Sequence, residues 1–138
     1  MEKDILKILS IIFYYIVRLR NYYYDRFNDE VLKKYNIICV GNIQVGGTGK
    51  TSFVTHLLKS DLKSEYKNIY VILRGYKGKL TNKNICVQSI NGVINYAVSD
   101  IGDEGYMLAM LFPDVKILIG KNKKKSLKFV EHPDNSVI

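Results

Sequence analysis

A glycine-rich segment that ends in lysine and threonine constrains the fold of this chain more than any other feature. Residues 46–51 read Gly-Gly-Thr-Gly-Lys-Thr. A short apolar run rich in β-branched residues, 36–41, precedes this segment, and apolar residues follow it at helical spacing, at Phe53, Val54, Leu57 and Leu58. A buried strand, a glycine-rich loop and a helix in this order are typical of a phosphate-binding loop, or P-loop. The sequence therefore predicts an α/β fold with a nucleotide-phosphate site at the start of a helix.

The residue types of the loop explain how it can hold a nucleotide. Glycine has no Cβ, so the backbone can curl and point successive N–H groups at one anion. The helix that follows adds the positive end of its dipole. Lys50 is placed to reach the β- and γ-phosphates, and the hydroxyl of Thr51 is placed to ligate Mg²⁺. The predicted nucleotide-binding residues are Gly46, Gly47, Thr48, Gly49, Lys50 and Thr51.

Three departures from known patterns bear on which class of P-loop protein this chain can belong to. The usual pattern begins with a glycine five residues before Gly49, and this chain has Gln44 there. Partitioning-type ATPases carry a lysine just before the paired glycines, and this chain has Val45. Guanine-nucleotide switch proteins need a motif such as Asn-Lys-x-Asp, and residues 82–84 are followed by no such aspartate. The sequence therefore argues against a partitioning-type ATPase and against a guanine-nucleotide switch protein.

The composition fits one globular domain with an additional N-terminal segment. The 138 residues are 47% hydrophobic and 25% charged, a balance that excludes a disordered chain. We divide them into an N-terminal helical region, 1–34, and a P-loop nucleotide-binding domain, 35–138. The net charge of +8 favours anionic partners without choosing among nucleotides, nucleic acids and acidic membranes. Cys39 and Cys86 lie in apolar stretches without disulfide or metal-site spacing, so we expect buried thiols.

The N-terminal segment is predicted to form an amphipathic helix over residues 5–24. Its uncharged run, 8–17, is too short for a spanning helix, which needs about 20 residues. Arginines follow that run at 18 and 20, unlike the cleavage site of a signal peptide. Two interpretations stay open: a helix that packs on its own domain, or an interfacial helix whose tyrosines and arginines meet lipid headgroups. The apolar residues at helical spacing are Ile5, Leu9, Ile12, Ile16 and Leu19.

The second half of the chain predicts further strands of a mostly parallel sheet with flanking helices. Residues 68–73 read as a buried strand that runs into Arg74, and residues 115–119 read as another. An arginine at the carboxyl end of such a strand can reach bound phosphate, and a solvated basic turn is the alternative. A small β-hairpin is predicted around an Asn-Gly turn, with strands 85–89 and 93–98.

Two charged clusters each allow two interpretations. Asp103 and Glu104 are predicted to open a helix, where acidic residues often only complement the helix dipole. The functional interpretation is that one carboxylate binds Mg²⁺ while the other takes a proton from an attacking hydroxyl. The lysines within 121–128 form either a solvated helix face or a contact with an anionic surface.

The order of these motifs resembles the tetraacyldisaccharide 4′-kinases, the lipid A 4′-kinases of Gram-negative bacteria. The likeness rests on residues 40–51, on Leu-Arg-Gly-Tyr at 73–76, on Gly-Asp-Glu at 102–104 and on the N-terminal stretch 18–25. It implies transfer of the γ-phosphate of ATP, with Mg²⁺, to the 4′-hydroxyl of a lipid-linked tetraacyl glucosamine disaccharide 1-phosphate. It also implies a peripheral enzyme on the cytoplasmic face of the inner membrane, with its N-terminal helix on the lipid surface and no nucleic-acid partner.

The resemblance also assigns roles by position. Asp103 and Lys50 would be the catalytic residues, with Asp103 as the base on the sugar hydroxyl. Glu104 would assist Thr51 at the metal. The further contacts expected to phosphate or substrate are Arg74 and Asn42.

The chain departs from the family pattern most clearly at its last residues. Family members continue into an apolar strand that ends in Asp-Asp-Gly-Phe-Gln-His and then into a second lobe, whereas this sequence stops at Ile138, about where that strand begins. Nearer the site, Ser52 and Gly105 stand where prolines are common, and residues 122–123 are Asn-Lys instead of Asp-Arg. We therefore expect a truncated form of the kinase. The alternative is a catalytically inactive remnant that binds nucleotide and membrane.

Overall fold

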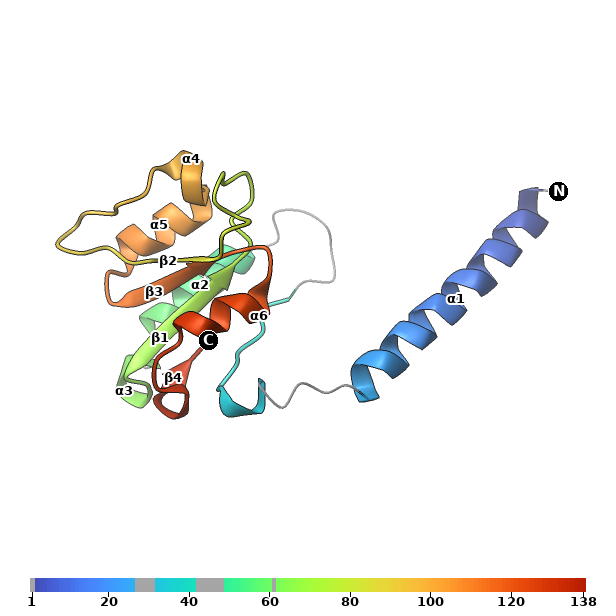
Figure 1. Ribbon diagram of the computed structural model, residues 1–138, viewed down its shortest axis with the longest axis horizontal. Coiled ribbons are helices and arrows are strands. Elements are labelled where there is room, and N and C mark those ends of the chain that lie inside the picture. Colours follow the sequence, from blue (N-terminus) through green and yellow to red (C-terminus); the bar gives the residue numbers. More distant parts are fainter. Residues whose placement is uncertain (1, 27–31, 42–48, 61) are drawn as a thin grey trace. The chain divides into compact units, whose positions relative to one another are not determined.

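The computed structural model describes residues 2–26, 32–41, 49–60 and 62–138, and it divides the chain into two compact units, Met1–Lys33 and Lys34–Ile138. The first unit contains helix α1 (Glu2–Arg26) (Figure 1). Apolar side chains along this helix are exposed, including Ile5, Ile12 and Leu19. Among the described helices, none is both long and apolar enough to cross a membrane.

The second unit is an α/β structure around a mixed sheet. Its strands are β1 (Asn68–Leu73), β2 (Ile85–Val87), β3 (Val115–Ile119) and β4 (Ser136–Val137). Its α-helices are α2 (Lys50–Lys59), α3 (Leu62–Glu65), α4 (Val98–Ile101), α5 (Asp103–Leu111) and α6 (Lys123–Ser126). Short 3₁₀ turns lie at η1 (Leu32–Lys34), η2 (Leu127–Phe129) and η3 (Pro133–Asn135).

The sheet has the strand order β2-β3-β1-β4. β1 runs parallel to both β3 and β4, while β2 is antiparallel to β3. The β1–β3 ladder pairs Ile69 with Val115 and Leu73 with Ile119, so these two parallel strands end together. Because β1 and β3 end together, the segments that follow Leu73 and Ile119 lie at the same end of the sheet. Ligands of open α/β sheets bind beyond this carboxyl end of the strands.

Helices cover both faces of the sheet. α2 and α5 pack on one face, where Leu58 and Leu108 join a core formed with Ile69, Ile117 and Val137. α6 packs against β1 and lies in front of the sheet in Figure 1, with α2 behind it. The alternation of side chains along each strand explains why strands buried on both faces are apolar at nearly every position. The strands predicted at 68–73 and 115–119 are confirmed with those bounds as β1 and β3.

The segment 36–41 differs from the buried strand that the sequence predicts. It lies beside β4 through one parallel bridge, Asn36 to Val137, and through an Ile38 N–H donated to the carbonyl of Ile138 at 2.8 Å. Ile37 and Ile38 are 46% and 42% exposed, and Cys39 is exposed as well. β4 is its neighbour on one side, and the described residues place no strand on the other. The prediction of a buried thiol is therefore wrong for Cys39.

Cys86 and the predicted hairpin also differ in detail from the sequence-based expectation. Cys86 is half-buried in β2, and burial raises the pKa of its thiol. The Asn-Gly turn forms, because Asn91 and Gly92 have φ angles of 52° and 78° and Ile90 and Val93 exchange backbone hydrogen bonds. The strands 85–89 and 93–98 do not pair further. Ile90 and Val93 are 63% and 61% exposed, so pairing there buries little, and β2 pairs with the buried strand β3 instead.

Candidate functional site

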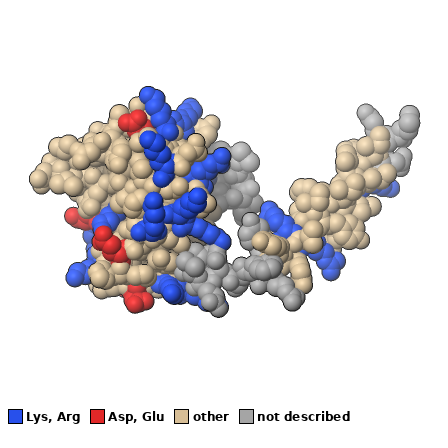
Figure 2. Space-filling view, viewed as in Figure 1, with Lys and Arg blue, Asp and Glu red and all other residues tan. Residues whose placement is uncertain are grey.

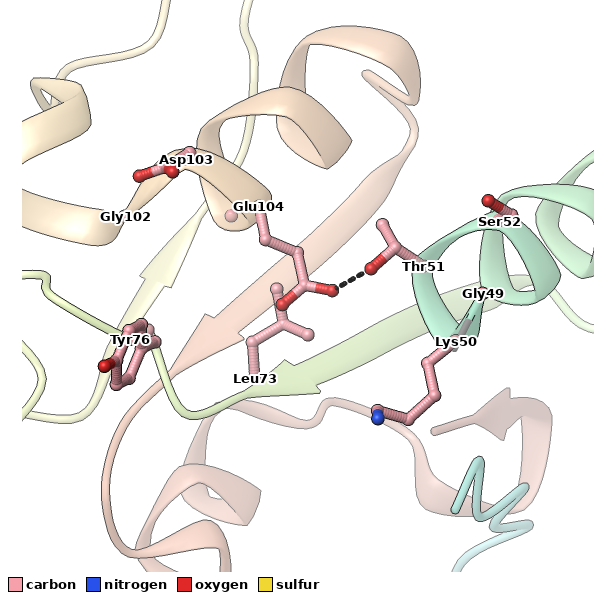
Figure 3. A pocket seen from close by; sticks show the side chains of 11 residues that line it. Gly49, Lys50, Thr51, Ser52, Leu73, Tyr76, Gly102, Asp103 and Glu104 are labelled. Carbon is pink, nitrogen blue, oxygen red and sulfur yellow. Dashed lines mark hydrogen bonds between the residues drawn. The ribbon is translucent and has the colours of Figure 1, made fainter. Parts of the chain in front are cut away.

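A cavity of about 760 Å³ opens at the carboxyl end of β1. Three segments supply its walls: the start of α2, the end of β1 with the turn that follows it, and the start of α5 (Figure 3). Its lining residues are Gly49, Lys50, Thr51, Ser52, Leu73, Gly75, Tyr76, Gly102, Asp103, Glu104 and Gly105. The glycine-lysine-threonine motif and the Gly-Asp-Glu motif, about fifty residues apart in sequence, therefore share one cavity.

The first turn of α2 places the two P-loop side chains in this cavity. Gly49 has a left-handed backbone with φ of 80°, which favours glycine, and its carbonyl accepts the N–H of Phe53 at 2.9 Å. Lys50 and Thr51 are the first two residues of the helix. Their side chains point in different directions because successive residues of an α-helix are rotated by about 100°. In Figure 3, Thr51 faces α5, while the exposed side chain of Lys50 extends away from it.

A hydrogen bond joins the two motifs across the cavity. The Thr51 hydroxyl donates to Oε1 of Glu104 at 2.5 Å (Figure 3). Asp103 lines the same cavity, but its carboxylate points away from this pair in Figure 3. Successive residues of an α-helix are rotated by about 100°, so adjacent carboxylates at the start of α5 serve different directions. The structure thus brings Thr51 and Glu104 together and keeps Asp103 separate from them.

The start of α5 is fixed by backbone contacts with the turn after β1. Gly102 has φ of 80° and ψ of 157°, and a β-carbon built there would lie 2.7 Å from the carbonyl oxygen of Tyr76. The N–H of Lys79 donates to the carbonyl of Ser99, and that of Leu80 to the carbonyl of Asp100, each at 3.0 Å. These contacts set where the carboxylates of α5 emerge. The sequence contains a signal for this arrangement, since a glycine is needed for such a close approach of two backbones.

The other predicted site residues fall in two groups, and one lining residue was not predicted. Asn42, Gly46, Gly47 and Thr48 lie outside the described residues. Arg74 is exposed directly after β1 and is not among the residues that line the cavity. Tyr76, which sequence reasoning did not single out as a site residue, lines it with a side chain that is 78% exposed. Its position after the carboxyl end of a parallel strand was the available signal.

The cavity offers two oxygen ligands side by side but no larger metal cluster. Within the described ranges, no group of three or more histidine, cysteine, aspartate or glutamate side chains is placed to hold a metal ion. The Thr51 hydroxyl and the Glu104 carboxylate are the hard oxygen donors that Mg²⁺ prefers. A Mg²⁺ that bridges nucleotide phosphates needs only one or two protein ligands, because phosphate oxygens and water supply the others.

Comparison with known proteins bears on what such a cavity serves. The family model described as tetraacyldisaccharide-1-P 4′-kinase, LpxK, matches residues 3–138. The chain belongs to this family. The resemblance drawn from the motifs is thereby confirmed.

Individual relatives carry the same name. The chain is 33% identical over 127 residues to the tetraacyldisaccharide 4′-kinase of Porphyromonas gingivalis, covering 91% of this chain and 33% of the relative. It is 36% identical over 111 residues to that of Aquifex aeolicus, covering 80% and 34%. It is 35% identical over 138 residues to that of Halothermothrix orenii, covering 97% and 35%. The chain thus spans about a third of the length of these relatives.

A solved structure of the family resembles the fold. The "apo" form of LpxK from Aquifex aeolicus, crystallised in complex with ATP, matches with a TM-score of 0.65 and 28% sequence identity. The match covers 99% of this chain and 43% of the LpxK chain. The likeness therefore extends over nearly the whole described fold, including the helices and strands that surround the cavity.

Proposed function

We propose that this chain is the nucleotide-binding part of a lipid A 4′-kinase. The reaction would transfer the γ-phosphoryl group of ATP to the 4′-hydroxyl of a lipid-linked tetraacyl glucosamine disaccharide 1-phosphate. The observation that carries the proposal is the Thr51–Glu104 hydrogen bond across the cavity. It joins the P-loop motif to the Gly-Asp-Glu motif in a member of the tetraacyldisaccharide-1-P 4′-kinase family.

Nucleotide binding is assigned to the start of α2 and the loop before it. Lys50 would contact the β- and γ-phosphates, and the glycines of the motif would present backbone N–H groups. Thr51 and Glu104 would hold Mg²⁺, since their oxygens already lie within hydrogen-bond distance of each other. When bound, the ion supplies positive charge that offsets the charge of the phosphates.

Asp103 is assigned as the general base. The oxygen of the 4′-hydroxyl would bond to the γ-phosphorus while the bond from that phosphorus to the β–γ bridging oxygen breaks, so that ADP leaves with the electron pair. The hydroxyl proton would pass to the carboxylate of Asp103. This carboxylate is exposed in the cavity, and no hydrogen bond within the described residues occupies it, which leaves it open to a substrate hydroxyl. Arg74 and Asn42 are assigned to phosphate or substrate contacts.

Helix α1 is assigned to the lipid surface. Its exposed apolar residues recur along the helix together with the arginines at 18 and 20 and the tyrosines at 14 and 15. Apolar, aromatic and basic side chains on one exposed helix suit the boundary between water and an anionic bilayer. We therefore place the protein peripherally on the cytoplasmic face of the inner membrane, with the lipid A precursor and ATP as its partners and no nucleic acid.

A transfer assay tests this function directly. The chain is mixed with Mg²⁺, ATP labelled on its γ-phosphate and the tetraacyl disaccharide 1-phosphate in detergent micelles. We expect label on the lipid, together with retention of ATP in a filter-binding assay. Retention of ATP without labelled lipid would instead identify an inactive nucleotide-binding remnant. A chain that does not retain ATP would contradict the assignment of the P-loop.

A further inference from the structure

A threonine hydroxyl closes the turn that follows β1. Thr81 is half-buried and is not among the residues that line the cavity at the end of β1. Its hydroxyl oxygen lies 2.8 Å from the carbonyl oxygen of Gly75 and 2.5 Å from that of Gly78. A hydroxyl has one hydrogen, so the two carbonyls share this donor. Because Gly75 lines the cavity, the hydroxyl of Thr81 holds part of the cavity wall from outside.

Hydrogen bonds have to hold this turn against repulsion between its own charges. The segment 74–83 contains basic residues and no carboxylate, and Figure 2 shows lysine and arginine side chains gathered on the face of the second unit that it draws. Like charges repel, so the side-chain charges of the turn favour an open conformation. The Thr81 hydroxyl opposes that opening. The exposed basic residues of the segment are Arg74, Lys77, Lys79 and Lys83.

The backbone of Thr81 is itself anchored to the sheet. Its carbonyl accepts the N–H of Lys121 at 2.8 Å. The residue before Lys121 is Gly120, whose N–H donates to the carbonyl of Leu73 at 3.0 Å and so extends the parallel pairing of β1 and β3 by one residue. The hydroxyl of Thr81 therefore projects from a backbone position that the sheet fixes.

The start of α5 is seated directly on this turn. Besides the backbone hydrogen bonds described above, two glycines let the segments approach closely. A β-carbon at Gly78 would lie 2.7 Å from the carbonyl oxygen of Asp100, and one at Gly102 would lie 2.7 Å from that of Tyr76. Backbone therefore meets backbone, and no side chain between them can absorb a shift of the turn. A displaced turn displaces Gly102 and with it the adjacent Asp103.

From these contacts we propose that Thr81 is a positioning residue for the start of α5. Its hydroxyl holds the turn after β1 in place, and the turn holds Gly102 and Asp103 at the cavity. The consequence for the reaction rests on the proposed function, in which Asp103 takes the proton of the acceptor hydroxyl. A general base must lie within hydrogen-bond distance of the proton that it removes, so a small displacement of Asp103 slows the transfer.

Loss of the hydroxyl should loosen the turn without unfolding the domain. Both carbonyls keep a backbone donor, because the N–H of Gly78 donates to Gly75 at 2.9 Å and the N–H of Thr81 donates to Gly78 at 3.4 Å. Thr81→Val keeps the shape of the side chain and removes the donor, whereas Thr81→Ser keeps the donor. We expect both variants to fold, with the urea midpoint of Thr81→Val only slightly below that of the parent.

Backbone amide signals in the NMR spectrum of the isotope-labelled chain report the position of α5 without any activity. Neither Gly102 nor Asp103 is a printed hydrogen-bond partner of Thr81, so their signals follow the turn and not the substitution itself. We expect Thr81→Val to shift and broaden the signals of Gly102 and Asp103. Thr81→Ser should leave them close to those of the parent.

A matched control and a second variant sharpen the comparison. The hydroxyl of Ser60 donates to the carbonyl of Leu57 at 2.6 Å at the far end of α2, so Ser60→Ala removes a bond of the same kind away from the cavity and should leave both signals in place. Gly78→Ala keeps the Thr81 hydroxyl but forces the turn away from the carbonyl of Asp100. It should move the same α5 signals as Thr81→Val.

Kinetics give the second readout. In a form of the protein that transfers phosphate, we expect kcat for transfer to the lipid to fall at least about tenfold in Thr81→Val and to return to within about twofold of the parent in Thr81→Ser. Affinity for ATP measured without Mg²⁺ depends on the P-loop and not on α5, so it should stay within about twofold of the parent in both variants.

Four outcomes would overturn the proposal: α5 signals that do not move in Thr81→Val, an equal shift in Ser60→Ala, no recovery in Thr81→Ser, or moved signals with an unchanged kcat. Failure of the proposed function looks different. A parent that neither retains ATP nor labels the lipid would contradict the kinase assignment, and the amide signals would then decide by themselves whether Thr81 places the start of α5.

Discussion

At the residue scale, Lys50 should decide whether the chain binds nucleotide. It is the first residue of α2, and its exposed side chain lines the cavity at the carboxyl end of β1. Replacing it with alanine removes a charge-assisted contact to phosphate, and we expect affinity for ATP to fall by about a hundredfold. Isothermal titration with Mg-ATP measures this. Lys59→Ala, at the last turn of the same helix, is the matched control, and undiminished binding by Lys50→Ala would contradict the P-loop assignment.

Replacement of Asp103 should slow phosphate transfer without weakening the binding of ATP. Its carboxylate points away from the Thr51–Glu104 pair, so Asp103→Asn leaves the proposed metal ligands unchanged. We expect ATP binding to stay within twofold of the parent while phosphate transfer to the lipid falls by about 10²- to 10⁴-fold, the usual contribution of a general base. The comparison is made in a form of the protein that transfers phosphate. Normal turnover in that variant would remove Asp103 from the mechanism.

Gly102 should be more sensitive to substitution than Gly92, another glycine with positive φ. Its φ and ψ of 80° and 157° belong to a region open almost only to glycine, and a β-carbon there approaches the carbonyl of Tyr76. We expect Gly102→Ala to lower the free energy of unfolding by about 1–3 kcal/mol, measured by urea denaturation. Gly92→Ala, with φ of 78° and open space around its β-carbon, should cost about 1 kcal/mol. Equal costs would show that the contact with Tyr76 is unimportant.

At the scale of elements, α1 should attach the protein to anionic lipid. Ile5, Ile12 and Leu19 are between 51% and 71% exposed, and Arg18 donates to the hydroxyl of Tyr14 at 3.3 Å. We expect deletion of residues 1–24 to release the chain from vesicles that contain phosphatidylglycerol, measured by sedimentation. Arg18→Gln combined with Arg20→Gln should weaken binding by about 1 kcal/mol per charge at low salt. Persistent binding of the deletion variant would assign attachment to another surface.

The elements also show what the sequence can and cannot predict here. The bounds of β1, the start of α5 and the helix after the P-loop follow from local periodicity and turn residues, and all three are confirmed. Burial of 36–41 was mispredicted because it depends on which strands flank it. The pairing of β2 with β3 likewise depends on a strand that lies far away in the sequence, so local patterns could not predict it. The Thr51–Glu104 bond joins residues 53 apart. The P-loop motif made Thr51 a candidate metal ligand, whereas the family resemblance was needed to assign the metal to Glu104 rather than to Asp103.

At the scale of the whole molecule, charge is distributed unevenly between the carboxyl and the amino ends of the parallel strands β1 and β3. Arg74 follows the carboxyl end of β1, and Lys121, Lys123 and Lys125 follow that of β3. The ion pair between Lys63 and Asp114, with N and O 3.0 Å apart, precedes the amino ends of the same strands. Basic residues therefore follow both of the strands that end beside the cavity lined by Gly49 and Glu104. The net charge of +8 favours the approach of anionic ligands to the molecule. The basic residues after β1 and β3 favour approach to the carboxyl ends of these strands.

The whole molecule should also divide cleanly into its two units. Among the residues that the structure describes, the buried hydrophobic core runs from Leu58 to Val137 and includes none from Met1–Lys33. We expect the fragment 34–138 to unfold in urea with the same midpoint and the same m-value as the full chain, because the same apolar surface is exposed. The fragment should also be the more soluble of the two, since it lacks the exposed apolar residues of α1. A midpoint lowered by removal of residues 1–33 would mean that the first unit stabilises the core, and would contradict the division at residue 34.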